Sequence, residues 1–277
     1  MTLSKYEEFC LSLGKQLTTR TLEGYIASLK RFREISGDKE LGEYTPADVE
    51  RFRSTLSLQG LQNSTVNIFL RSLKALFYRA VVLQLLTSNI FSRVKLNRVP
   101  RTAPMFLSPE DLEKLLVRVR KRALKDIYTF LWHTGLRITE LINLKWTDVD
   151  MKRGWMVIMF SKSGRSRGIP LNAKALGILQ KFPVNARTGN VFKNRNGTPL
   201  KRTAISHSFK KAVRRAGLPE GLHLHSTRHS TASVGIMRGI DISTIQKLLG
   251  HSSPLTTMSV YGHISDAHMI EKIKLLE

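Results

Sequence analysis

The chain of 277 residues has a single cysteine, Cys10, and this scarcity excludes two classes of structure. One thiol cannot form a disulfide framework or supply the thiolates of a zinc cluster. Long apolar runs are also missing, because the best candidate, from Ala80 to Leu86, is far shorter than the ~20 residues that cross a bilayer. The first residues lack the apolar core of a signal peptide. We therefore expect a soluble intracellular protein, located in the cytoplasm.

Acidic residues are scarce as well: 21 Asp and Glu stand against 45 Lys and Arg, a formal net charge of +24. No acid occurs between Glu50 and Glu110, where nine basic residues lie, or between Asp150 and Glu220, where sixteen lie. Solvated surfaces usually mix both signs, so these tracts favour a polyanion as partner. A membrane surface is a weaker alternative because the basic residues are dispersed through foldable elements. The remaining alternative is a basic surface that binds no partner.

Apolar spacing and capping signals predict helices throughout the first ~90 residues. We expect them near Ser4–Leu13, from Thr19 or Thr21 to Gly37, after Thr45-Pro46 and after Asn63-Ser64. The periodicity then disappears, and alternating basic residues and prolines indicate an extended basic linker. The sequence therefore predicts a helical domain over residues 1–91, a linker over 92–107 and a second domain over 108–277.

The second domain reads as mixed, with mostly helical segments. Helices are expected at about 108–121, 123–134, 137–144, 172–181, 203–216, 226–238, 241–249 and 265–276. Trp155–Phe160 and Arg167–Leu171 are expected as two strands of a hairpin whose turn, residues 161–166, is basic. The predicted fold class is mainly α with a small antiparallel β-sheet.

Three residues stand where phosphate chemistry could use them. Arg137 follows a glycine helix stop at the start of a new helix, where free N–H groups and a guanidinium suit a phosphate. His225 and Arg228 are three residues apart and share one helical turn, so an imidazole that moves protons lies beside a guanidinium that holds charge. His229 is interpreted as a core histidine because Ala232 and Ile236 continue its face.

In this order, the segments resemble the tyrosine recombinase (phage integrase) family. The resemblance rests on five pieces: Thr134-Gly135-Leu136-Arg137-Ile138-Thr139-Glu140-Leu141, the hairpin Lys162, His225-x-x-Arg228-His229, Leu248-Leu249-Gly250-His251-Ser252 and Tyr261. The helical N-terminal part is similar to that family's SAM-like core-binding domain, and residues 105–277 are similar to its mixed α+β catalytic domain. His251 and Tyr261 are ten steps apart, where many members show nine. Without an additional arm-binding domain, the chain looks like a two-domain, Xer-like member.

The resemblance implies a site-specific recombinase with six catalytic residues: Arg137, Lys162, His225, Arg228, His251 and Tyr261. Tyr261 would attack a DNA phosphodiester and form a 3′-phosphotyrosine, with His225 as the base. The two arginines would clamp the non-bridging oxygens, Lys162 would protonate the leaving 5′ oxygen, and His251 would brace the phosphate. No cofactor and no metal are expected. Candidate DNA contacts are Arg71, Lys74, Arg79, Arg165, Arg167, Arg202, Lys210 and Arg214.

The resemblance also implies double-stranded DNA as partner and a homo-oligomer, a tetramer on two DNA sites. The helix at 265–276 would pack either on its own domain or on a neighbouring subunit, and Tyr261 would act in cis or in trans. Integration, excision and chromosome-dimer resolution all stay open as the biological use. Three alternatives remain: a type IB topoisomerase-like enzyme, a non-catalytic DNA-binding protein, and metal catalysis by His223, His225 and His229.

Overall fold

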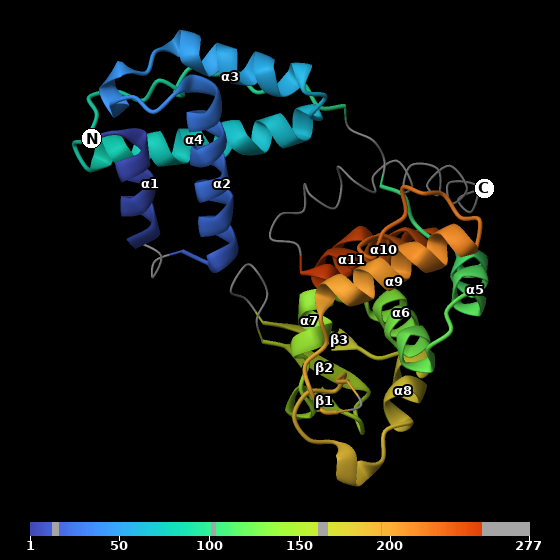
Figure 1. Cartoon of the computed structure of the whole chain (residues 1–277). Helices are drawn as coiled ribbons and strands as arrows, with labels where there is room; N and C mark the ends of the chain where they lie inside the picture. The colour runs from blue at the N-terminus through green and yellow to red at the C-terminus, as the bar shows by residue number, and fades with distance from the viewer. Residues whose placement is uncertain (13–16, 101–103, 160–165, 195, 251–277) are drawn as a thin grey trace, which may run out of the picture. The chain divides into compact units, whose positions relative to one another are not determined.

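A computed structural model describes residues 1–12, 17–100, 104–159, 166–194 and 196–250. The chain divides into two compact units, Met1–Arg101 and Thr102–Glu277, which are described separately below. Helices dominate both units, and the described part contains one three-stranded antiparallel sheet (Figure 1). The predicted fold class is confirmed. No described helix is long and apolar enough to cross a membrane.

The first unit is built from helices whose ends the sequence marks clearly. They are α1 (Leu3–Ser12), α2 (Thr19–Ser36), the 3-10 turn η2 (Leu41–Glu43), α3 (Pro46–Leu58) and α4 (Asn63–Val82). The side chain of Thr18 accepts a hydrogen bond from the backbone N–H of Thr21, so Thr18 caps α2. The sequence predicted a start at Thr19 or Thr21, so the cap lies one residue before the earlier of these two positions. Thr45 and Asp48 form a capping box at α3. All four predicted helices are confirmed.

Phe32 on α2 is the centre of the first core. Its ring lies 5.0 Å from Tyr44, 5.2 Å from Phe52 and 5.5 Å from Phe91 between ring centroids, mostly edge to face. The Tyr6 hydroxyl on α1 donates to the Leu76 carbonyl on α4 over 2.7 Å. Phe32 also meets Phe77 on α4 edge to face, 6.1 Å apart between centroids, so these contacts join all four helices into one bundle.

The segment predicted as an extended linker is anchored at both of its ends. Asn67 on α4 and Asn97 exchange two hydrogen bonds of 2.8 and 2.9 Å, which fix the segment's first half on the bundle. At the other end Leu107 is fully buried in the second unit, and its N–H donates to the Ser230 hydroxyl over 2.7 Å. The loss of helical periodicity in the sequence therefore indicated only that the backbone changes shape. The segment is anchored by hydrogen bonds between residues that are far apart in the sequence.

The second unit carries the sheet and the remaining helices. Its elements are α5 (Pro109–Val117), α6 (Arg122–Thr134), α7 (Ile138–Asn143), η3 (Trp146–Asp148), β1 (Val149–Asp150), β2 (Trp155–Ile158), β3 (Arg167–Pro170), α8 (Ala173–Gln180), η4 (Val184–Ala186), α9 (Arg202–Arg215), α10 (Ser226–Met237) and α11 (Ile242–Leu249). The strand order is β1-β2-β3, with Ile158 opposite Arg167. β1 was not predicted because two residues are too few to show alternation.

One expected helix differs in length from the structure, and two expected segments lie mostly or wholly outside the described residues. α5 ends at Val117, four residues earlier than expected, because Lys121 already caps α6. Most of the basic turn at 161–166 and the whole helix expected at 265–276 lie outside the described residues. The other predicted helices agree to within one or two residues at each end.

α6 is the helix around which the second unit packs. α5, α8 and α10 all contact it, α11 packs on both α10 and β3, and α9 contacts α5 and α7. The Tyr128 hydroxyl on α6 donates to the Ile205 carbonyl on α9 over 3.1 Å, and its ring meets Phe209 edge to face. This packing brings the start of α7, the start of α10 and the end of α11 into one region.

Candidate functional site

Arg137 stands between two helices, where Gly135 allows the chain to turn sharply. Gly135 adopts a left-handed conformation, with φ of 65°, and a side chain there would come within 2.8 Å of Leu249. Arg137 then caps α7, and its N–H and Nη1 each donate to the Glu140 carboxylate over 2.8 Å. Glu140 therefore accepts one of the backbone N–H groups at this helix start, that of Arg137 itself. The Arg137 side chain keeps 28% of its surface exposed.

Glu140 is buried between two guanidinium groups. Arg167, the first residue of β3, donates to both of its carboxylate oxygens over 2.9 and 2.7 Å. Burial alone would raise the pKa of the Glu140 carboxyl, but the hydrogen bonds from Arg167 and Arg137 outweigh it and lower the pKa. The carboxylate is therefore charged at neutral pH, with a side chain only 3% exposed.

Arg167 is a buried brace, and its expected contact with DNA is not supported. Its side chain is 8% exposed, and besides Glu140 it donates through Nε to the Leu248 carbonyl over 3.0 Å. A Cβ on Gly250 would lie 2.7 Å from its Cδ, so this glycine lets the end of α11 approach closely. Arg167 thus links β3, α7 and α11.

Arg228 lies on the floor of the same region and is 2% exposed. Its Nη1 donates to the Gly135 carbonyl over 2.8 Å, and its Nη2 donates to the Leu249 carbonyl. The last carbonyls of a helix lack partners within the helix, so Arg228 and Arg167 together hold the end of α11. The same contacts fix the turn that carries Arg137.

His225 caps α10 and lies among positive charges. Burial of the ring, followed by the charges of Arg228, His223, Arg137 and Arg202, lowers its pKa to about 4, although the residue keeps part of its surface exposed. Its ring meets that of His229 edge to face, 5.0 Å apart between centroids. The imidazole is therefore neutral at pH 7 and able to accept a proton.

The structure thus brings Arg137, His225 and Arg228 into one region, and Arg202 at the start of α9 acts on the same imidazole. The other predicted site residues Lys162, Arg165, His251 and Tyr261 lie outside the described residues. Sequence reasoning missed Glu140. The spacing of three residues from Arg137 to Glu140, typical of a capping box, was the available signal.

The three DNA candidates on α4 differ in their surroundings. Arg71 is exposed. Lys74 donates from Nζ to the Ser92 carbonyl over 2.7 Å. Arg79 is half-buried, and its charge acts on Tyr6 and Cys10.

Two candidates on α9 are engaged by the chain itself. Lys210 donates from Nζ to the Glu220 carbonyl, and Arg214 pairs with the Glu220 carboxylate over 3.6 Å between Nε and Oε1. Arg202, on the first turn, is exposed. Both Lys210 and Arg214 therefore have a partner within the chain, and only Arg214 is paired with a negative charge.

The histidines considered as metal ligands have other neighbours. The Nδ1 atom of His223 lies 2.7 Å from the Ser226 hydroxyl, within hydrogen-bond distance. His229 is half-buried beside His225, close to its expected place in the core. Across the described ranges, no group of three or more His, Cys, Asp or Glu side chains is placed to hold a metal ion.

Comparison with known families agrees with this arrangement. The model of the phage integrase family matches residues 105–268, and that of the phage integrase N-terminal SAM-like domain matches residues 6–86. The chain belongs to the phage integrase family. This recombinase is 30% identical to the tyrosine recombinase XerA of Pyrococcus furiosus, over 98% of its own length and 94% of the relative's. The resemblance drawn from the motifs is confirmed.

Solved structures show the same fold in other members. The integrase of the transposon Tn1549, in complex with a circular intermediate DNA, matches with a TM-score of 0.80 and 20% identity, over 99% of each chain. A lambda integrase tetramer bound to a Holliday junction matches with a TM-score of 0.76 and 23% identity, over 91% of this chain and 76% of that one. The recombinase therefore has the integrase fold along nearly its whole length.

Proposed function

We propose that this site-specific DNA recombinase cuts and rejoins DNA through a 3′-phosphotyrosine on Tyr261. The catalytic set would be Arg137, Lys162, His225, Arg228, His251 and Tyr261. The observation that carries the proposal is the convergence of two arginines on a neutral imidazole, since a phosphate under nucleophilic attack needs both positive charge and a base.

His225 is the base in this mechanism. A phenol with a pKa of about 10 is a weak nucleophile until its proton is removed. The imidazole is neutral at pH 7, so it takes the proton as the Tyr261 oxygen bonds to phosphorus. The bond from phosphorus to the 5′ oxygen breaks, and Lys162 gives that oxygen a proton. Attack by a 5′-hydroxyl on the phosphotyrosine reverses these steps, so rejoining needs no ATP.

The buried ion pairs position the groups that hold the phosphate. Arg137 and Arg228 offset the negative charge that grows on the non-bridging oxygens. Glu140 orients Arg137, and Arg167 donates to both oxygens of the same carboxylate, so the negative charge of Glu140 is paired with two guanidinium groups. Arg228 and Arg167 hold the carbonyls of Leu249 and Leu248, directly before the segment that carries His251.

Double-stranded DNA is the proposed partner, held by both units. The helical domain over 1–91 and the catalytic domain over 108–277, joined by residues 92–107, would each contact the duplex. A tetramer on two DNA sites is the proposed assembly, and the lambda integrase tetramer on a Holliday junction supports it. Exchange of the segment 265–276 between subunits and a cytoplasmic location belong to the same proposal.

Strand exchange between two sites tests this function. The cleavage site is first mapped on the host's own DNA, and two copies are placed in a supercoiled plasmid. Wild type should delete or invert the segment between them, and Tyr261→Phe should do neither. Tyr78→Phe, which changes an exposed tyrosine on α4, is the matched control and should recombine normally. Relaxation without exchange would indicate a topoisomerase, and binding without either would indicate a non-catalytic DNA-binding protein.

A further inference from the structure

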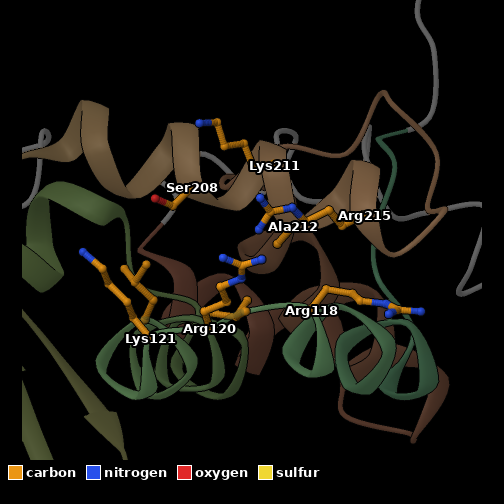
Figure 2. Close-up of a pocket in the computed structure, with 9 residues that line it drawn as sticks. Arg118, Arg120, Lys121, Ser208, Lys211, Ala212 and Arg215 are labelled. Carbon is orange, nitrogen blue, oxygen red and sulfur yellow. The ribbon is translucent and has the colours of Figure 1, made fainter.

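A basic pocket lies between the end of α5 and the second half of α9 (Figure 2). Arg118, Arg120 and Lys121 form one wall, and Ser208, Lys211 and Arg215 form the other. Apolar side chains, among them Leu124, complete its lining. The Arg120 and Arg215 side chains extend into the space between the two walls. Since like charges repel, this arrangement favours an anion between them.

Among the described residues, no carboxylate pairs with the cations of the basic pocket. Within the described ranges, no ion pair or side-chain hydrogen bond engages Arg118, Arg120, Lys121, Lys211 or Arg215. The neighbouring carboxylates are used elsewhere, because Asp126 pairs with Lys181 and Glu220 pairs with Arg214. Five positive charges therefore have no acidic partner within the part of the chain that the structure describes.

A second pair of basic residues lies on α9, each member one position before a residue of the pair that lines the pocket. Lys211 and Arg215 are four residues apart, as are Lys210 and Arg214, so each pair lies on one face of the helix. Glu220 engages Lys210 and Arg214, but the other pair lines the pocket. Each face carries one lysine and one arginine. Of these four side chains, only those of Lys210 and Arg214 have a hydrogen-bond or ion-pair partner among the described residues.

We propose that the basic pocket binds the sugar-phosphate backbone of duplex DNA and contributes affinity without taking part in the chemistry. This inference rests on the proposed function for the identity of the polyanion. Arginine and lysine suit phosphate oxygens, and none of the described residues that line the pocket has an aromatic ring on which a base could stack. At 1.5 Å per residue, Ser208–Arg215 lies roughly 9–20 Å along α9 from Arg202, which corresponds to about 3–6 base pairs.

The test compares the two faces of α9 in the full-length protein. Lys211→Ala/Arg215→Ala and Lys210→Ala/Arg214→Ala are each titrated onto a 40-base-pair duplex of mixed sequence between 50 and 200 mM salt. The pocket variant should lower the slope of log affinity against log salt by about 2 and the affinity by about 10-fold or more at 0.1 M salt. The other variant should change the slope by less than about 0.5. Arg120→Gln, from the opposite wall, should lower the slope by about 1.

Equal effects of the two double variants, or no effect of Arg120→Gln, would overturn the proposal. The proposal would also be overturned if the pocket variant lost binding to phosphatidylserine vesicles but kept its affinity for DNA. Each variant must keep the wild-type unfolding midpoint, which shows that any loss of affinity is not a loss of fold. Formation of the Tyr261 adduct at saturating DNA should be unchanged by the pocket variant. A wild-type protein that binds through the pocket but forms no adduct would refute the proposed function alone.

Discussion

Replacing His225 with glutamine should lower the rate of DNA strand cleavage by about 100-fold or more, because general-base catalysis contributes ~10²–10⁴-fold. Glutamine keeps a hydrogen-bonding group but cannot accept the Tyr261 proton at neutral pH. His207→Gln is the matched control, because His207 is exposed on α9. This variant should cleave DNA at the wild-type rate. Single-turnover cleavage of a nicked duplex measures both variants. An equal rate for wild type and His225→Gln would remove His225 from the mechanism.

The pH profile follows from the same group. Because the pKa of His225 is lowered to about 4, the base is neutral throughout the range above about pH 5. The value of kcat/KM, which reports the free enzyme, should therefore lose no activity to His225 protonation between pH 8 and pH 5, and should fall below that range. Protons bind the unfolded ring more readily than the folded one, so this group lowers stability as the pH falls from about 6.5 towards 4. A loss of activity centred near pH 6.5 that disappears in His225→Gln would contradict this assignment.

Replacing Arg167 with methionine should lower the free energy of unfolding by about 3 kcal/mol and the melting temperature of the catalytic unit by roughly 6–12 °C. The change leaves the buried Glu140 carboxylate with Arg137 alone and releases the Leu248 carbonyl. Arg153→Met is the matched control, because its side chain is 85% exposed and pairs only at the surface with Asp150. That variant should cost less than about 1 kcal/mol. Thermal and urea unfolding measure both.

Two further measurements attribute the loss to the buried charge. The ionised Glu140 contributes stability that is present above its unfolded pKa of about 4.3 and is lost as the pH falls through the lower folded pKa. The cost of Arg167→Met should therefore be largest near neutral pH and shrink in acid. Glu140→Gln/Arg167→Met should be more stable than Arg167→Met alone, because no buried carboxylate then lacks the Arg167 charge, and Arg137, the partner that loses its carboxylate, is partly exposed. A double variant less stable than the single one would point to packing as the cause.

Interactions within one helical turn were predictable from the sequence. Thr45 with Asp48 and Ser108 with Asp111 form capping boxes, and Gly135 ends α6 in the left-handed conformation that a glycine stop requires. Each depends on residues at most four positions apart. The same locality placed His225 and Arg228 on one turn, which is why the sequence identified the part of the site on α10.

Interactions across long separations were not predictable. Arg167 and Glu140 are 27 residues apart, and their pairing depends on β3 lying beside α7. Arg167 therefore read as one more basic residue in an acid-free tract. Glu220, the first acid after that tract, engages Lys210 and Arg214, and a count of charges along the sequence could not distinguish this pair from Lys211 and Arg215.

The central claim is that one tyrosine oxygen becomes covalently bonded to DNA. The most direct measurement incubates the protein with a nicked duplex that carries its mapped site, digests the trapped complex and locates the nucleotide by mass spectrometry. The account predicts a 3′-phosphonucleotide on the peptide that contains Tyr261, formed in the presence of EDTA and missing in Tyr261→Phe. An adduct on another residue, or cleavage that persists undiminished in Tyr261→Phe, would contradict it.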